Sequence, residues 1–358
     1  MRRDFWKSKR VLITGHTGFK GSWLSLWLQY LGAEVYGFSL MPDKDLNLYN
    51  LAQVGKGMES AYGNILDYEV LRSYIQSVQP DIIFHLAAQP LVRESYYKPI
   101  ETFSTNVMGT AHLLEAARHT DSVRVVINVT SDKCYENNNQ SSGFSEEDPV
   151  GGADPYSASK GCAELVTAAY ERSYFCNTNK LLSSVRAGNV IGGGDWASDR
   201  LVPDIVRAVI SRDKLIIRNP NAIRPWQHVL DCLNGYLVLA QKMWDFGKEF
   251  TGPWNFGPGE DAILSVDQIL DEFKKNFGDR LNVIYENDNQ LYEASRLVLN
   301  TKKVQTKLSW EIQLPIFESI QWTIEWYSTY INGFADLTMQ QINRFEHLYE
   351  SQRVKSDE

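Results

Sequence analysis

Two side chains that together suit proton transfer stand four positions apart in the segment DPYSASKG. They are Tyr156 and Lys160, and Pro155 is of a type favoured at the start of a helix, so both should lie on one helix face. A lysine ammonium favours ionisation of a nearby phenol, whose pKa is ordinarily about 10, so Tyr156 could accept a proton from a hydroxyl group. The alternative is an exposed aromatic ring beside a solvated lysine. The neighbouring motifs favour the chemical interpretation.

A glycine-rich stretch near the N-terminus indicates a binding site for a dinucleotide that could act together with this proton transfer. In RVLITGHTGFKG, a short apolar run is followed by Gly15, Gly18 and Gly21, and residues 22–31 have helical apolar spacing. Gly15 permits a sharp turn, Gly18 lets the backbone approach phosphate, and Gly21 lets the helix pack on the strand. This strand, turn and helix predict a dinucleotide pyrophosphate site, although an ordinary strand-to-helix turn has a similar pattern. An oxidised nicotinamide would add a positive charge that also favours tyrosinate.

The residue at the end of the second predicted strand bears on which dinucleotide would bind. Ser39 falls where such sites often carry an acidic residue for the adenosine ribose. Asp43 or Asp45 could replace that acid. The choice between NAD and NADP is therefore open at this point, and a loosely held, exchangeable cofactor is compatible with the sequence.

Apolar runs and helical periodicities alternate along the first half of the chain. Strands are predicted at 34–38, 81–86, 123–129 and 181–185, and helices at 101–119 and 157–175. The alternation implies right-handed crossovers, and so an α/β fold with a doubly wound, mostly parallel sheet and helices on both faces.

From about Asn189 this alternation gives way to connections that contain Gly and Pro, which indicates a second region. Helices are predicted at 231–244 and, on the surface, at 340–358. We therefore predict two interleaved lobes. One is a nucleotide-binding lobe of residues 1–188 plus about 226–250, and the other is a smaller, mixed α/β substrate lobe of residues 189–225 plus about 251–358.

The overall composition argues against several classes of protein. A net charge of −8 over 358 residues disfavours general binding to nucleic acid or to an anionic membrane. The four cysteines have no metal-ligand spacing, so we expect reduced thiols and no metal site. No apolar leader segment precedes the first strand and no run is long enough to span a bilayer, so a cytoplasmic protein is expected.

Several motifs together resemble those of the extended short-chain dehydrogenase/reductase family over nearly the whole chain. They are GHTGFKG, HLAAQP, TNVMGT, the serine after the 123–129 strand, and YSASK. The resemblance implies a Rossmann-type lobe and NAD as the cofactor. In this family a Ser or Thr orients the substrate hydroxyl, Tyr is the acid/base and Lys holds the nicotinamide ribose, which maps onto Ser131, Tyr156 and Lys160. The cofactor-binding residues implied are Gly15, Thr17, Gly18, Phe19, Gly21, Ser39, Asn64, Ile65, Leu86, Ala87, Ala88, Gln89, Asn106, Tyr156 and Lys160.

The segment VTSDKCY resembles the sugar-nucleotide 4,6-dehydratase branch of that family. Members of the branch place an acidic pair here to remove water across C5 and C6, whereas this chain has Asp132 and Lys133. Once C4 is a ketone the C5 proton is acidified, so a neutral Lys133 could remove it while Asp132 protonates the departing C6 hydroxyl. Hydride would then return to C6. For an arbitrary Asp-Lys dipeptide, an ion pair in a turn would be the better interpretation.

The stretches GHTGFKGSWL and RAGNVIGGGDW extend the resemblance and imply CDP-glucose as the substrate. The product would be CDP-4-keto-6-deoxyglucose, a precursor of 3,6-dideoxyhexoses in lipopolysaccharide O-antigen. Arginine offers a planar fork to a diphosphate, and the substrate-binding candidates are Asn189, Arg200, Leu201, Arg224, Trp226 and Arg296. Trp226 would also suit the core. The helices near 99–119 and 157–175 are where family members pair, which implies a homodimer or homotetramer.

Three other functions are compatible with parts of this pattern. A UDP-N-acetylglucosamine 4,6-dehydratase would differ in the base and in an N-acetyl pocket. A sugar-nucleotide 4-epimerase would leave Asp132 and Lys133 with little chemical purpose. An inert NAD-sensing protein of the same fold would typically lack the active-site tyrosine, whereas Tyr156 and Lys160 are present here.

Overall fold

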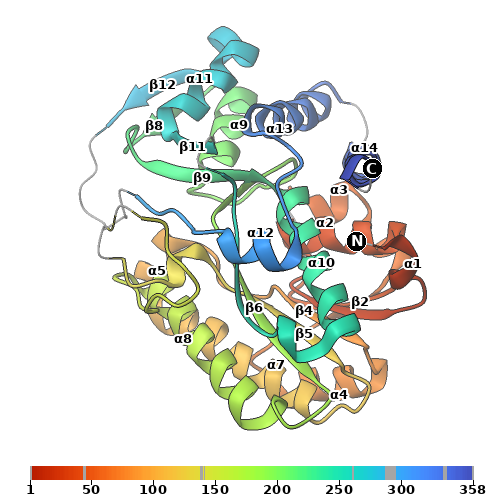
Figure 1. Cartoon of the computed structure of the whole chain (residues 1–358). Helices are drawn as coiled ribbons and strands as arrows, with labels where there is room; N and C mark the ends of the chain where they lie inside the picture. Colours follow the sequence, from red (N-terminus) through yellow and green to blue (C-terminus); the bar gives the residue numbers. More distant parts are fainter. Residues whose placement is uncertain are drawn as a thin grey trace.

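A seven-stranded sheet forms the centre of the larger lobe in the computed structural model (Figure 1). The structure describes residues 2–42, 46–137, 140, 142–259, 262–286, 296–333 and 337–356. All neighbouring strands of the sheet are parallel, in the order β10-β6-β5-β4-β1-β2-β3. The strands are β1 (Arg10–Thr14), β2 (Glu34–Ser39), β3 (Glu59–Tyr62), β4 (Ile82–His85), β5 (Val125–Val129), β6 (Leu181–Ala187) and β10 (Gly252–Phe256).

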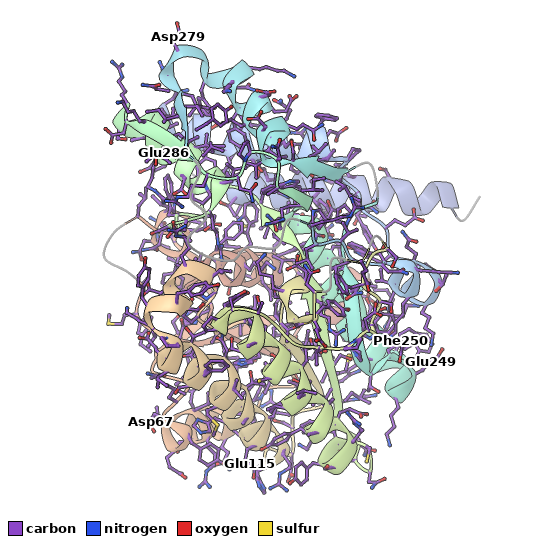
Figure 2. The ribbon with its side chains drawn as sticks, turned by 90° about the vertical axis from the view of Figure 1, so that its left-hand side faces the viewer. Asp67, Glu115, Glu249, Phe250, Asp279 and Glu286 are labelled. Carbon is purple, nitrogen blue, oxygen red and sulfur yellow. The ribbon has the colours of Figure 1, made fainter. Side chains whose placement is uncertain are left out.

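Helices cover both faces of this sheet, as the continuous apolar strands require. Successive strand residues point to opposite faces, so Val11 and Ile13 of β1 enter one apolar core while Leu12 enters a second. The first core is closed by α2 (Phe19–Tyr30) and α10 (Val229–Phe246). The second is closed by α4 (Tyr68–Val78), α7 (Gly109–Arg118) and α8 (Pro155–Tyr170), and α7 and α8 run side by side (Figure 2).

The predicted long helices are present but two of them are interrupted. The 101–119 prediction corresponds to α6 (Pro99–Phe103), a π-helical turn at Ser104–Met108, and α7. The 157–175 prediction corresponds to α8 followed by a second π-helical turn at Glu171–Phe175. The other helices are α1 (Arg3–Trp6), α3 (Leu48–Leu51), α5 (Val92–Tyr97), α9 (Leu201–Ser211), α11 (Val266–Phe277), α12 (Lys302–Leu308), α13 (Ile316–Ile331) and α14 (Thr338–Ser356). Across the described ranges, no helix is both long and apolar enough to cross a membrane.

Two small sheets form the second lobe. A three-stranded sheet has the order β11-β9-β7, and a two-stranded parallel sheet pairs β12 with β8. Their bounds are β7 (Asn189–Ile191), β8 (Lys214–Ile217), β9 (Ile223–His228), β11 (Ile263–Ser265) and β12 (Asn282–Tyr285). Figure 2 shows Asp279 and Glu286 of this lobe at the opposite end of the molecule from Asp67 and Glu115 of the larger lobe.

The structure corrects two of the predicted lobe boundaries. Strand β10, which falls in the range 251–358 assigned to the small lobe, pairs with β6 at the edge of the large sheet. Residues 226–228, assigned to the large lobe, belong to β9 of the three-stranded sheet. The physical reason is burial, because Trp254 and Phe256 of β10 are fully enclosed in the core beneath α10.

The turn between β1 and α2 is tightly packed. Gly15 has φ of +75°, and a Cβ there would lie 2.7 Å from the backbone nitrogen of Ala87, at the end of β4. A Cβ on Gly21 would lie 2.1 Å from the carbonyl oxygen of Gly15. Real Cβ atoms do not approach backbone this closely, so the helix can begin here only because both positions are glycine.

We predict that Gly21→Ala will lower the free energy of unfolding by about 3 kcal/mol, because the new methyl group must displace backbone rather than a flexible side chain. Gly257→Ala is the matched control, since its Cβ would meet no atom nearer than 3.5 Å. Urea unfolding of both variants measures the difference. Equal stabilities of the two variants would contradict the packing described for the turn.

Candidate active site

A cavity of about 1160 Å³ lies between the carboxyl edge of the large sheet and the smaller lobe. One side of its wall comes from the turns that follow β1, β2, β4 and β5, and the other from segments around β7, β8 and β9. Pockets for one small ligand typically measure about 300–1,000 Å³, and this cavity lies slightly above that range. In open parallel sheets ligands bind at this edge, where the strand order reverses.

The β1–α2 turn provides an anion site at one end of the cavity. Gly18 is the N-cap residue of α2 and places no side chain over the helix terminus. The amides of the first helical turn and the positive end of the helix dipole therefore suit a pyrophosphate, and the residues present fit a dinucleotide. The predicted cofactor residues that line the cavity are Gly15, Thr17, Gly18, Phe19, Gly21, Ser39, Asn64, Ile65, Leu86, Ala87, Ala88, Tyr156 and Lys160.

Ser39, at the position where such sites often carry an acid for the adenosine ribose, lines the cavity and is hydrogen-bonded to a neighbouring side chain. Its hydroxyl oxygen lies 2.7 Å from that of Thr17, which also donates to the carbonyl of Leu40 at 3.2 Å. The two acids named as substitutes, Asp43 and Asp45, lie outside the described residues.

Two predicted cofactor residues have a supporting position instead, because neither Gln89 nor Asn106 lines the cavity. The Asn106 amide receives the backbone N–H of Gln89 at 2.8 Å and donates to its carbonyl at 3.0 Å. It also donates to Ser159 Oγ at 2.8 Å, so its polar atoms are engaged in joining the segment after β4 to α8.

Helix α8 places Tyr156 and Lys160 on the cavity wall, as their spacing predicts. The Asp154 carboxylate accepts the backbone N–H of Ser157 at 2.9 Å, which caps the helix, and Pro155 begins it. Lys160 Nζ donates to the carbonyl of Val129, the last residue of β5, at 3.3 Å. This hydrogen bond fixes the lysine at the edge of the sheet, one helical turn from the phenol.

Burial controls the protonation of both groups in the protein chain itself. It raises the pKa of Tyr156 to about 12, although a hydrogen bond with Ser131 acts in the opposite direction. Burial also lowers the pKa of Lys160 to about 8, and the positive charge of Lys20 adds to that effect. The sequence predicted that Lys160 and an oxidised nicotinamide together lower the phenol pKa. In the chain alone burial raises this pKa instead, and it outweighs the lowering effects of Ser131 and Arg200. The positive charge that an oxidised nicotinamide adds belongs to the complex.

The predicted loop of Ser131, Asp132 and Lys133 follows β5 directly and faces the same cavity. Ser131 caps a short 3₁₀ helix at Asp132–Cys134, because its hydroxyl accepts the N–H of Lys133 at 3.2 Å and donates to Asp132 Oδ1 at 3.0 Å. Asp132 is almost fully buried, and its Oδ2 atom has no hydrogen-bond partner in the described part of the chain. A buried carboxylate oxygen left free in this way is available to a ligand.

The small lobe contributes five of the six predicted substrate residues to the cavity wall, namely Asn189, Arg200, Leu201, Arg224 and Trp226. Arg200 forms an ion pair with Asp195 at 2.9 Å, and its charge is close enough to influence the phenol of Tyr156. Arg224 is buried and donates to the carbonyl of Ile223 at 2.9 Å.

The sixth, Arg296, is exposed and does not line the cavity as described. Its backbone forms an isolated bridge to Ile223, and its carbonyl accepts from Asn137 at 3.1 Å. These backbone contacts hold the 296–300 segment in place, and the Arg296 side chain lies at the surface.

Other charged residues in the wall were missed at the sequence level. Lys20 lies in the first turn of α2, with Nζ 3.8 Å from Cys232 Sγ. A cation is unfavourable at the positive end of a helix, so a lysine in the first turn of a predicted helix was a signal in the sequence that Lys20 has a role in the site. Asp199 forms ion pairs with Arg93 at 3.6 Å and Arg218 at 3.3 Å. No local pattern links those two arginines.

Comparison with known proteins agrees with this geometry. The family model described as GDP-mannose 4,6 dehydratase matches residues 12–323. A CDP-glucose 4,6-dehydratase of Salmonella typhimurium is 47% identical over 336 residues, which are 92% of this chain and 94% of that protein.

Solved structures with the same fold include an epimerase from Methanothermobacter thermautotrophicus, with a TM-score of 0.81, 22% identity and 96% coverage of both chains. They also include a dTDP-glucose 4,6-dehydratase from Bacillus anthracis in complex with NAD, with a TM-score of 0.76 and 23% identity over 91% of this chain and 99% of that one. Because the family model covers most of the sequence and a relative nearly half identical spans almost all of it, this chain belongs to the GDP-mannose 4,6 dehydratase family.

Proposed function

We propose that this protein catalyses the NAD-dependent dehydration of CDP-glucose to CDP-4-keto-6-deoxyglucose. The observation that carries the proposal is the placement of Asp132 and Lys133 beside Ser131 and Tyr156 in one cavity. The choice of CDP-glucose is supported by the Salmonella relative, which is 47% identical and carries that activity in its name. NAD is supported by the glycine turn, whose residues Gly15, Gly18 and Gly21 line the cavity.

In the first half-reaction, the oxidation of C4, three residues take part. Ser131 orients the C4 hydroxyl, Tyr156 takes its proton, and Lys160 holds the nicotinamide ribose. The chemistry that bound NAD supplies is reversible hydride storage, so that C4 is oxidised at the start and C6 is reduced at the end. Burial raises the pKa of Tyr156 in the chain alone, and the positive charge of a bound oxidised nicotinamide would oppose that shift.

In the second half-reaction, the loss of water, the catalytic groups come from the loop after β5. The C4 ketone acidifies the proton on C5, and a neutral Lys133 removes it. Asp132 in its protonated form gives its proton to the C6 hydroxyl, which leaves as water, and a double bond forms between C5 and C6. Return of hydride to C6 and of a proton to C5 completes the product, so the net change is the loss of one water. Arg200 and Arg224 line the cavity, and we assign them to the diphosphate because a guanidinium group can donate two hydrogen bonds to phosphate oxygens.

The proposal predicts one product among several substrates. The purified protein with NAD should convert CDP-glucose in deuterated water to a 4-keto-6-deoxy product with solvent deuterium at C5, seen by mass spectrometry and NMR. dTDP-, UDP- and GDP-glucose serve as competitors, and faster conversion of one of them would replace the CDP assignment. Formation of a 4-epimer without loss of water would refute the dehydratase mechanism.

The two half-reactions should fail separately in variants. Tyr156→Phe should abolish the appearance of reduced cofactor at 340 nm, because no group remains to take the C4 proton, with a loss of roughly 10²–10⁴-fold. Lys133→Met should retain that signal but incorporate little deuterium at C5. Asp132→Asn should retain exchange at C5 and slow the loss of water. If Lys133→Met lost both steps to the same degree, the division of labour would be incorrect.

We also propose that the chain forms a homodimer through the face made by α5, α6 and α8. The side chains of Tyr97, Ile100 and Leu165 on these helices are 73%, 79% and 58% exposed, which is unusual for large apolar residues grouped on packed helices. Covering this face with a second copy would bury them. The family resemblance points to two of these helices, α6 and α8, together with α7.

Light scattering should give a mass of twice the 40.9 kDa chain for the native protein and of a single chain for Leu165→Glu. Phe246→Glu is the control, because Phe246 is similarly exposed at 61% but lies at the end of α10. A monomeric native protein, or a Leu165→Glu variant that stays dimeric, would rule out this interface.

A further inference from the structure

Behind the proposed acid/base loop lies a buried polar chain that the mechanism does not use. Glu164 and Arg186 form an ion pair at 2.7 Å, and their side chains are only 5% and 4% exposed. Glu164 stands on α8 one turn beyond Lys160, and Arg186 stands on β6. Arg186 also donates to the hydroxyl of Tyr135 at 2.7 Å, and Tyr135 donates to Asn255 Oδ1 of β10 at 2.7 Å.

This chain of contacts reaches both ends of the loop. At the first end, the Thr130 hydroxyl donates to the Glu164 carboxylate. At the second end, Tyr135 directly follows the 3₁₀ turn Asp132–Cys134 and is 1% exposed. Four residues lie between the two anchors. Ser131, Asp132 and Lys133 line the cavity, whereas Cys134 is fully buried.

The far end of the chain is fixed to the sheet and to a distant segment. Asn255 lies on β10, the edge strand of the large sheet, and its amide donates to the carbonyl of Phe144 at 2.8 Å and to that of Asn300 at 3.1 Å. The ring of Phe144 stacks on Tyr135 with centroids 5.0 Å apart. The second anchor therefore rests on a rigid strand rather than on the loop's own backbone.

A buried ion pair is a weak source of stability, because removing two charges from water offsets much of their attraction. Here Thr130 and Tyr135, which border the loop, each contact one member of the pair, and Glu164 also accepts from Ser184 Oγ of β6 at 2.7 Å. The Arg186 charge holds the pKa of Glu164 below its usual value in spite of burial. The arrangement is thus better suited to fixing a geometry than to adding stability.

We propose that the Glu164–Arg186–Tyr135 chain is a positioning device for the elimination step, and that it acts by holding Asp132 and Lys133 at the cavity wall. This inference rests on the proposed function, because it assigns the elimination step to the loop. The two anchors affect different parts of the loop. Ser131 lies next to Thr130 and to β5, whereas Asp132 and Lys133 lead into the turn that Tyr135 ends.

The decisive variant is Tyr135→Phe, which removes one hydroxyl and keeps the ring that stacks on Phe144. A single-turnover reaction with NAD and CDP-glucose in deuterated water follows C4 oxidation at 340 nm and C5 deuterium by mass spectrometry. Oxidation should stay within about twofold of the native protein, while deuterium incorporation and water loss fall at least about tenfold, because small misplacements of acid/base groups have large kinetic effects.

Ser183→Ala is the matched control, because Ser183 lies on β6, the same strand as Arg186. The substitution removes a buried hydrogen bond of 3.0 Å from the Ser183 hydroxyl to the carbonyl of Phe250, which is not part of the loop. It should lower thermal stability and leave the ratio of the two rates unchanged. Equal loss of both steps in Tyr135→Phe, unchanged elimination, or the same altered ratio in Ser183→Ala would overturn the positioning role.

Lys133→Met in the same assay separates the two levels of inference. Normal exchange in Lys133→Met would remove the base assigned under the proposed function, and the Tyr135→Phe ratio would still decide whether the buried chain positions the loop. Impaired exchange in Lys133→Met together with a native ratio in Tyr135→Phe would refute the positioning role alone.

Discussion

The parallel arrangement of all seven strands is the constraint on which the rest of the protein depends. Because every strand runs in the same direction, every carboxyl end lies along one edge of the large sheet. Gly15 after β1, Ala87 after β4, Ser131 after β5 and Asn189 after β6 therefore meet around one cavity, although up to 174 positions separate them in the sequence. No single segment contains the active site, and the sheet is what assembles it.

Much of the larger lobe could be predicted from sequence for a simple physical reason. Strands β1, β4 and β5 are buried on both faces, so each appears as a mostly apolar run. Strand β10 lacks that signal because its sequence, GPWNF, contains Gly, Pro and Asn. Its place beside β6 is decided by long-range burial of Trp254 and Phe256, which no local pattern reports.

In the candidate site, too, the residues with a local sequence pattern were predictable and those positioned by long-range contacts were not. Tyr156 and Lys160 were predictable because helical periodicity fixes their shared face, and the glycines were predictable because their turn has steric requirements. Asn106 and Arg296 were placed by resemblance, which carries no information on where a side chain points in this chain. Arg186 and Tyr135 had no local signal, since their contact joins β6 to a loop 51 positions earlier. Electrostatic outcomes such as the raised pKa of Tyr156 depend on burial, which also requires the three-dimensional structure.

The path of the chain between the lobes limits how the cavity can change. After building β7, β8 and β9 in the small lobe, the chain returns to the large one for α10 and β10, then leaves again for β11 and β12. The two walls are thus tied by several covalent crossings rather than by one hinge. Large opening of one lobe against the other would strain each crossing. We therefore expect ligand exchange to proceed by local rearrangement of the cavity rim rather than by wide opening about one hinge.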